Sequence, residues 1–439
     1  MLRFHTIFLR LTVAEPARRR RLGCAVLTLL LLAASCGKPA GTLSDREAAA
    51  RLGEAGRLVP FYAALAALER GERTDPVTVL QIGDSHTAND AFSGRMRELF
   101  QARFGDAGRG VLPPGIPYRW YKPARVHVAA SGWGVVSSFD ARTSGPFGLT
   151  GLRQHADGPA DMMLSADAPG ELQQAGVEVL QQPGGGTLEY AFDGGASGTI
   201  ATDAPRPTAA RFGLAGGDAT ALTLRARGDG PVDVLAWWAR RRAPGVIWAN
   251  LGTVGATVDL LGRWDLDIVA GELASLHPAL IVVAFGTNEA FKPGFDTGHY
   301  GALYAERVRL LRAAAPDAAL AVIGPPDANR RAGPGTIETQ VCGRDEGGIR
   351  PALWAEPDNL AQIRDSEHEV ADADGYWFWD WSEAMGGRCS MWRLVRDDPT
   401  AAAPDHVHLF APGYRATAER LFAAMMDGYE RYLALKRER

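Results

Sequence analysis

Cysteine is scarce in this chain, with four residues among 439. Cys24 and Cys36 fall in an apolar stretch near the N-terminus, so only Cys342 and Cys389 belong to the body of the protein. This count excludes a small disulfide-rich scaffold. Outside the cytoplasm the two remaining cysteines can form one disulfide, or they can stay as two unpaired thiols, and the sequence leaves both alternatives open.

Tracts of one charge and metal-binding motifs are also lacking. The net charge is -4 and no Lys/Arg tract occurs in the body of the chain, which speaks against a nucleic-acid partner. Neither an H-E-x-x-H motif nor a clustered His/Asp set is present, so we expect no metal and no cofactor. Nothing in the sequence indicates the oligomeric state.

No apolar run is long enough to span a membrane comfortably, because a transmembrane helix needs roughly 20 apolar residues. The apolar stretch 22–34 follows a basic run at 18–21, which is the layout of a secretory signal. The sequence Leu-Ala-Ala-Ser-Cys-Gly at 32–37 resembles a bacterial lipobox, which is cleaved before its cysteine. We therefore expect a signal peptide over 1–36, lipidation of Cys36 and an exported, periplasmic lipoprotein. Plain secretion after a nearby cleavage is the alternative, and the true start codon is left open.

Continuous apolar runs separated by helical patterns predict the fold class. Such runs imply a parallel sheet with helices on both faces. We predict an α/β three-layer domain with a five-stranded parallel sheet, preceded by a tether and N-terminal helix over 37–72. The predicted strands are 77–82, 246–250, 280–285, 319–323 and 376–381, and the main helical patterns are 46–72, 88–104, 260–276, 300–315 and 413–436.

The stretch 111–244 interrupts this pattern. It is dense in Gly, Thr, Pro and Asp, and its apolar residues alternate over short spans. Short alternating strands with frequent turns predict an antiparallel β-sandwich, inserted between the two parts of the α/β domain, 73–110 and 245–439. Its aromatic residues either stack on sugar rings or fill the sandwich core. The tryptophans concerned are Trp120, Trp133, Trp237 and Trp238.

Ser85 is the first candidate for chemistry. It stands in Gly-Asp-Ser-His at 83–86, directly after the first predicted strand and before a helical pattern. Ligands bind at the carboxyl ends of strands in open α/β sheets, and a helix N-terminus favours developing negative charge. A Gly-Asp-Ser tripeptide alone also fits an ordinary turn. The neighbouring His86 fits a role in shaping this loop better than a catalytic one.

A second candidate group lies near the C-terminus, in Asp-His-Val-His at 405–408. Residues three apart in a turn can face each other, so Asp405 can orient His408 while His408 accepts the proton of a serine. His406 would point the other way, which is typical of a packing or surface histidine. The spacing therefore predicts that Asp405 and His408 act with Ser85.

Two further loops offer hydrogen-bond donors for an oxyanion. Gly-Thr-Asn-Glu at 286–289 follows one predicted strand, and Gly-Thr-Val-Gly at 252–255 follows another. The side chain of Asn288 and the backbone N–H of Gly255 can donate to a tetrahedral intermediate, each contributing roughly 3–4 kcal/mol in the transition state. All these motifs lie at one edge of the predicted sheet.

The order G-D-S, G, G-x-N and D-x-x-H resembles the four sequence blocks of the SGNH (GDSL-like) hydrolases. This resemblance implies a flavodoxin-like fold in which Ser85 is the nucleophile and Asp405 and His408 complete the triad. It also implies that Ser85, Gly255 and Asn288 form the oxyanion hole. Glu289 replaces the usual aspartate after the asparagine, a departure from the family pattern.

Within that family, the chain is similar to the peptidoglycan O-acetylesterase group. The segments 81–87 and 380–387 and the large insertion carry this similarity, and in that group the insertion resembles a carbohydrate-binding module. The similarity implies hydrolysis of O-acetyl esters of carbohydrate, such as O-acetylated peptidoglycan or another envelope polysaccharide, through an acetyl-serine intermediate. An O-acetyltransferase, a lipase or lysophospholipase, and an inactive glycan-binding protein stay open as alternatives.

Overall fold

The computed structural model describes residues 43–333, 336–346, 352–397 and 399–437. The predicted signal peptide, the lipobox, and Cys24 and Cys36 lie outside the described residues. Within this part of the chain, no helix is both long and apolar enough to cross a membrane.

A five-stranded sheet forms the centre of the α/β part, with the order β13-β1-β14-β15-β19. All neighbouring strands are parallel, which confirms the predicted fold class. Counted along the chain, the strand order is 2-1-3-4-5, as in flavodoxin-like folds. The strands are β1 (Val77–Gly83), β13 (Val246–Gly252), β14 (Pro278–Ala284), β15 (Ala319–Gly324) and β19 (Trp377–Asp380).

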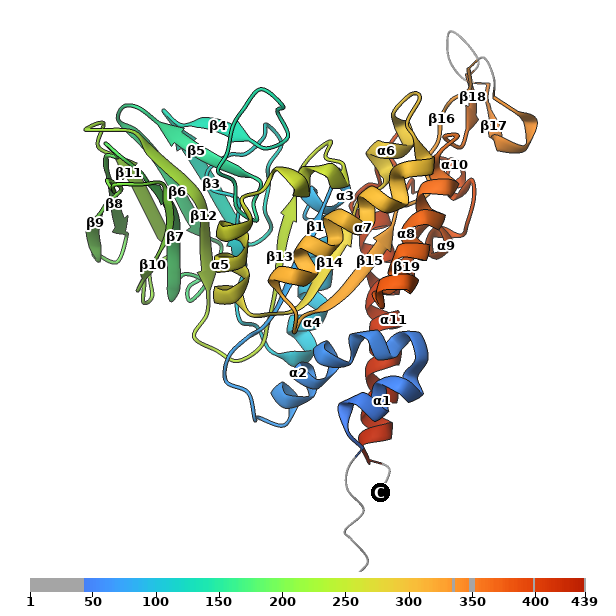
Figure 1. Ribbon diagram of the computed structural model, residues 1–439, viewed down its shortest axis with the longest axis horizontal. Coiled ribbons are helices and arrows are strands. Elements are labelled where there is room, and N and C mark those ends of the chain that lie inside the picture. The colour runs from blue at the N-terminus through green and yellow to red at the C-terminus, as the bar shows by residue number, and fades with distance from the viewer. Residues whose placement is uncertain (1–42, 334–335, 347–351, 398, 438–439) are drawn as a thin grey trace, which may run out of the picture. The chain divides into compact units, whose positions relative to one another are not determined.

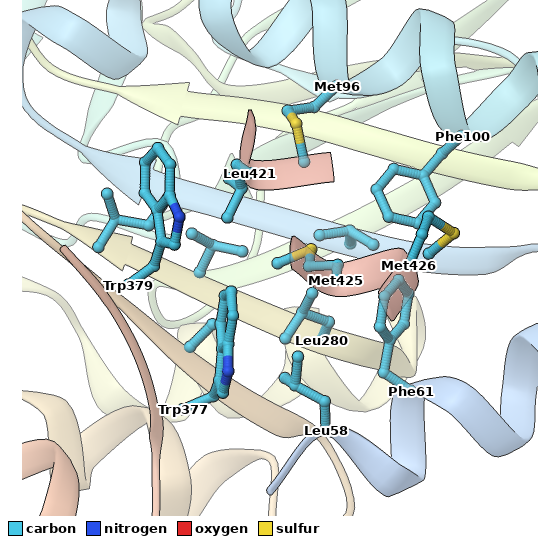
Figure 2. Packing of buried hydrophobic residues seen from close by; sticks show 14 of the residues in the cluster. Leu58, Phe61, Met96, Phe100, Leu280, Trp377, Trp379, Leu421, Met425 and Met426 are labelled. Atoms are coloured by element: carbon cyan, nitrogen blue, oxygen red, sulfur yellow. The ribbon is translucent and has the colours of Figure 1, made fainter. Parts of the chain in front are cut away.

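One face of this sheet is covered by helices from both ends of the described chain (Figure 1). Figure 2 shows Phe61, Phe100, Met425 and other large side chains gathered over the strands. They are buried together with Trp248 of β13, so the N- and C-terminal helices share one core. The helices are α1 (Asp45–Leu52), the 3-10 helix η1 (Gly53–Leu58), α2 (Val59–Glu69), α4 (Ala91–Phe104) and α11 (Ala411–Arg437).

The opposite face packs against α5 (Leu266–Leu276), α7 (Thr297–Ala314) and α8 (Leu360–Asp374). Alternate residues of each strand point to the two faces. Val79 of β1 accordingly lies in the first core, and Leu80 and Ile82 lie in the second. This alternation of fully buried residues explains why the strands are continuous apolar runs in the sequence.

The inserted stretch forms two antiparallel sheets that enclose a third buried cluster. One sheet has the order β10-β7-β12-β5-β4 with β2 beside β12, and the other has the order β3-β6-β11-β8-β9. Val111 and Ala236 lie in the same buried cluster as Ile247 of β13, so the sandwich packs on the edge of the parallel sheet. The strands are β2 (Gly110–Leu112), β3 (Val126–Ser131), β4 (Gly134–Ser137), β5 (Leu152–Ala156), β6 (Ala160–Ala166), β7 (Gln174–Gln181), β8 (Thr187–Phe192), β9 (Ser197–Ala201), β10 (Thr208–Leu214), β11 (Ala221–Ala226) and β12 (Val232–Arg240).

The sequence patterns did not indicate a small region between β15 and the C-terminal helix. It contains α8 and a three-stranded sheet of β16 (Arg330–Arg331), β18 (Ala352–Ala355) and β17 (Val341–Asp345). Cys342 of β17 is bonded to Cys389, which precedes α10 (Ser390–Leu394). Of the two alternatives for these cysteines, the structure thus contains the disulfide.

Candidate active site

Ser85 lies at the carboxyl end of β1, where it opens the short helix α3 (Ser85–Ala88). Asp84 is the N-cap of this helix, and its Oδ1 accepts a hydrogen bond from the backbone N–H of His86 at 2.9 Å. The strand order reverses around β1, and this reversal is where open α/β sheets form their ligand crevice. Ser85 itself is half-buried, so the turn presents its hydroxyl at the edge of the sheet.

The structure brings Ser85, His408 and Asp405 together although the serine and the histidine are 323 positions apart in the sequence. Ser85 Oγ and His408 Nε2 are 3.0 Å apart, and His408 Nδ1 and Asp405 Oδ2 are 2.8 Å apart. Asp405 Oδ1 also accepts hydrogen bonds from the backbone N–H groups of Val407 and His408. These bonds hold the carboxylate in the turn while its second oxygen fixes the imidazole.

The electrostatics of this chain of hydrogen bonds favour an ionised aspartate beside a basic histidine. The hydrogen bond with Asp405 raises the pKa of His408 above its ordinary value, and this effect outweighs partial burial. Partial burial opposes ionisation of Asp405, but its hydrogen bonds with His408 and the backbone outweigh it and keep the pKa well below the usual range. The carboxylate can therefore stabilise an imidazolium that forms during a reaction.

Gly255 and Asn288 lie in neighbouring loops after β13 and β14. Asn288 belongs to α6 (Thr287–Phe291), and its Nδ2 donates to the carbonyl of Ala256 at 2.9 Å. Gly255 has a φ of +79°, a conformation that L side chains rarely adopt. The backbone N–H of Thr253 donates to Gly83 at 2.9 Å, which ties this loop to the turn that carries Ser85. Within the described chain, the backbone N–H groups of Ser85 and Gly255 have no hydrogen-bond acceptor.

Glu289, the departure from the family pattern, connects the two loops. It is 1% exposed, and its two carboxylate oxygens accept hydrogen bonds from the backbone N–H groups of Val258 at 2.8 Å and Gly286 at 3.1 Å. Burial raises the pKa of Glu289 to about 7. Its side chain therefore links the loop of Gly255 to the loop of Asn288 and holds the two at a set distance. The sequence left this supporting contact undefined.

A buried network around Asp90 was not expected from the sequence. Asp90 Oδ1 accepts from Arg97 Nη2 at 2.8 Å, and its Oδ2 accepts from Arg109 Nη2 at 2.9 Å. Burial opposes ionisation of Asp90, but these two guanidinium groups outweigh it and hold its pKa well below the usual range. Asn250 Nδ2 lies 3.2 Å from Asp90 Oδ1 and 2.6 Å from the carbonyl of Thr87, so the network reaches the helix of Ser85.

The two other candidate histidines are packing residues. His86 is 1% exposed, its Nδ1 lies 2.9 Å from the hydroxyl of Tyr414, and burial lowers its pKa to about 3. The ring of His406 stacks on Trp354 with centroids 3.6 Å apart. His86 therefore shapes its loop and His406 packs against Trp354, and the sequence favoured a loop-shaping role for the first and a packing or surface role for the second.

A cavity of about 590 Å³ opens beside Ser85 and His408. Val254, the neighbour of Gly255, lines it, and so do Tyr118 and Trp120 from the segment between β2 and β3. Trp120 is 72% exposed, whereas Trp237 is fully buried in the sandwich core. The four tryptophans of the insertion thus do not act as one set, and the exposed one lies at the cavity.

Comparison with known proteins supports a family assignment. The model of the GDSL-like Lipase/Acylhydrolase family matches residues 215–416, which include Gly255, Asn288, Asp405 and His408. Ser85 lies before the matched range, and most of the inserted sandwich stands between them in the sequence. None of the curated proteins matches this chain.

Among solved structures, a peptidoglycan O-acetylesterase is similar to this chain with 26% identity and a TM-score of 0.69, and the match covers 84% of this chain and 96% of that one. A family two carbohydrate esterase from Clostridium thermocellum, in complex with cellohexaose, matches with 13% identity and a TM-score of 0.27, and covers 67% of this chain and 98% of that one. The second similarity is too low to bear on function. The sheet order, the order of the motifs and the matching family model agree, and the chain belongs to the GDSL-like lipase/acylhydrolase (SGNH) family of carboxylic ester hydrolases.

Proposed function

We propose that this protein is a serine esterase that removes O-acetyl groups from carbohydrate. The observation that carries the proposal is the chain of hydrogen bonds from Ser85 through His408 to Asp405, with donor–acceptor distances of 3.0 Å and 2.8 Å. A hydroxyl within hydrogen-bond reach of an imidazole, which a carboxylate orients, is the arrangement required for nucleophilic catalysis. The reaction needs no cofactor.

In the first half of the reaction, Ser85 Oγ attacks the carbonyl carbon of the acetyl ester while His408 Nε2 takes the hydroxyl proton. Asp405 stabilises the imidazolium without taking a proton itself. When the tetrahedral intermediate collapses, the bond between the acetyl carbon and the sugar oxygen breaks. The imidazolium returns its proton to that oxygen, which leaves the deacetylated sugar and an acetyl-serine.

In the second half, a water molecule attacks the acetyl-serine and gives a proton to His408. Collapse of the second intermediate breaks the bond to Ser85 Oγ, releases acetate and returns the proton to Ser85. The backbone N–H groups of Ser85 and Gly255 and the side chain of Asn288 would hold the oxyanion in both halves. An amide nitrogen has two hydrogens, so Asn288 can donate one to Ala256 and keep the other for the oxyanion.

For the substrate, we propose O-acetylated peptidoglycan or another polysaccharide of the cell envelope. The similarity to a peptidoglycan O-acetylesterase over 84% of the chain supports this choice.

We further propose that the sandwich over 111–244 binds glycan, and that residues 1–36 direct export and lipidation at Cys36. The Cys342–Cys389 disulfide is consistent with an exported protein.

The direct test is acetate release from purified O-acetylated peptidoglycan, with p-nitrophenyl acetate as a second substrate. We expect the wild-type protein to release acetate from both, and Ser85→Ala to reduce each rate at least about 10³-fold. Hydrolysis of the small ester but not of the glycan would exclude peptidoglycan and lead to other polysaccharides or lipids. Absence of Ser85-dependent hydrolysis of either substrate would contradict the proposal and favour acetyl transfer or glycan binding.

A further inference from the structure

We propose that the segment 118–122 is a subsite for the carboxylate of an acidic glycan, so that the acetyl esters cleaved at Ser85 belong to anionic sugars. This inference rests on the proposed esterase function and extends it to substrate specificity. The segment contributes Tyr118, Arg119, Trp120 and Lys122 to the cavity that also contains Ser85 and His408.

The charge of this cavity differs from that of the whole chain. The protein has a net charge of -4, yet the cavity lining contains the cations Arg119 and Lys122 and no Asp or Glu. Both cations are exposed, and in the described part of the chain neither forms an ion pair, whereas the buried Arg97 and Arg109 are both paired with Asp90. Two unpaired cations on one wall of a cavity fit an anionic ligand.

Trp120 supplies a surface suited to a sugar ring. Its side chain is 72% exposed, which is unusual for so large an apolar group, and it lines the cavity. The guanidinium of Arg119 lies 4.7 Å from the centre of the Trp120 ring, and this cation–π contact orients the two side chains together. Exposed tryptophan beside cations favours a ligand that has both an apolar ring face and a negative charge, as an acidic pyranose has.

The segment is held firmly at both ends, so the subsite is formed before a ligand binds. The hydroxyl of Tyr118 donates to the carbonyl of Ala88, three residues after Ser85, at 2.9 Å. Beyond Lys122, the backbone N–H of Ala124 donates to the buried carboxylate of Asp90 at 2.8 Å. The first bond ties the segment to α3, the helix of the nucleophile, and the second ties it to the N-cap residue of α4. Preorganisation of this kind favours binding.

A matched pair of substrates tests this proposal. Oligomers of polygalacturonate are compared with carboxyl-reduced oligomers of the same length that carry the same degree of O-acetylation, and kcat/KM is measured from acetate release. We expect the wild-type protein to prefer the acidic oligomers about tenfold, the effect of two exposed ion pairs, and 0.5 M salt to weaken the preference. Equal kcat/KM values for the two substrates would overturn the proposal.

Variants then assign the preference to the segment. The double substitution Arg119→Gln/Lys122→Gln should bring the acid-to-neutral ratio close to one, and Trp120→Ala should lower kcat/KM on both oligomers. The matched control is Arg70→Gln/Arg73→Gln, which removes two charges before the amino end of β1, the edge of the sheet opposite Ser85. The control should keep the wild-type ratio. A preference that survives in Arg119→Gln/Lys122→Gln would contradict the proposal.

Failure of the esterase proposal can be recognised separately. If the wild-type protein shows no Ser85-dependent hydrolysis of p-nitrophenyl acetate, the subsite is tested by binding instead. Calorimetry then measures the affinity of the protein for unacetylated acidic oligomers and for carboxyl-reduced oligomers. Tighter binding of the acidic oligomers, lost in Arg119→Gln/Lys122→Gln, would support the subsite alone. Equal binding of the two oligomers would overturn it.

Discussion

At the scale of single residues, the position of Asp405 matters more than the motif that contains it. The chain has a second D-x-x-H pair, Asp296 and His299, with the same hydrogen bonds: Asp296 Oδ2 lies 2.6 Å from His299 Nδ1. Asp296 Oδ1 also accepts the backbone N–H of His299 at 3.3 Å. This pair caps α7 on the surface, and in the described chain no hydrogen bond joins His299 to a serine. The spacing of D-x-x-H therefore suffices to form a carboxylate–imidazole pair. Such a pair can act in catalysis only where it lies beside a nucleophile, as Asp405 and His408 do beside Ser85.

Asp405→Asn should change both the rate and the pH profile. The hydrogen bond with Asp405 is the main cause of the raised pKa of His408, so the variant lowers that pKa. Because His408 must be neutral to accept a proton, wild-type kcat/KM should rise with pH through a midpoint above 6.5, the value of a free histidine, and the midpoint of the variant should lie lower. The rate should fall about 10³- to 10⁴-fold. The measurement is kcat/KM for p-nitrophenyl acetate from pH 5 to 9.

Asp296→Asn is the control for this prediction, since it makes the same chemical change in the exposed pair. It should leave the rate and the midpoint unchanged. A variant at Asp405 whose midpoint is not lower than that of the wild-type protein would show that another group controls the profile.

At the scale of elements, the active-site loops depend on buried polar contacts as well as on the apolar cores. Asp90 joins α4 (through Arg97), the start of the sandwich (through Arg109) and the segment before β3 (through Ala124). Arg97 and Arg109 are each 1% exposed. Ions removed from water to this extent are stable only while they stay paired.

Asp90→Asn should therefore destabilise the protein by about 3–5 kcal/mol, because two buried guanidinium groups lose their counter-charge. Urea denaturation gives the free energy of unfolding. The matched control is Asp161→Asn on the sandwich surface, where the pair with Arg225 is exposed and the loss should stay within about 1 kcal/mol. Similar losses in the two variants would contradict a special role for the Asp90 network.

The disulfide stabilises the region between β15 and α11. It closes a loop with a sequence separation of 47 and links β17 to the start of α10. The double substitution Cys342→Ser/Cys389→Ser should lower the free energy of unfolding by about 2–4 kcal/mol. Dithiothreitol should destabilise the wild-type protein by a similar amount and leave the double variant unchanged. A wild-type protein that is indifferent to reductant would contradict this contribution.

At the scale of the whole molecule, the three-layer α/β part and the inserted stretch both contribute residues to the cavity beside Ser85 and His408. The sandwich follows the strand and helix of Ser85, and the chain returns from it into β13, whose loop carries Gly255. The insertion therefore separates two parts of one site, and its first connecting segment lines the cavity beside Ser85.

The proposed anchor is also a property of the whole molecule. We expect the full-length protein, expressed in a bacterium that processes lipoproteins, to incorporate labelled palmitate and to sediment with membranes. Cys36→Ser should abolish both, whereas Cys24→Ser should retain them because Cys24 lies within the predicted signal. Incorporation of label into Cys36→Ser would contradict lipidation at that residue.

The sequence by itself determined the parallel sheet and the residues at its active edge. The strands are buried on both faces, so they are continuous apolar runs. The motifs of Ser85, Gly255 and Asn288 follow three of these strands directly, at the carboxyl ends where ligands bind in such sheets. Local patterns of this kind depend on neighbours in the chain, and they are visible in a single sequence.

The motif order had already predicted that Ser85, His408 and Asp405 meet, but only the tertiary structure decided the other contacts between distant residues. It joined Cys342 to Cys389, an alternative that the sequence left open, and it paired Asp90 with Arg97 and Arg109. The sequence grouped Trp120 with the aromatic residues of the sandwich, whereas the structure shows that Trp120 lines the cavity. Contacts of this type depend on how separate elements pack, and helical or strand periodicity carries no information about them. Periodicity therefore predicted the scaffold, and long-range packing decided which residues line the cavity beside Ser85.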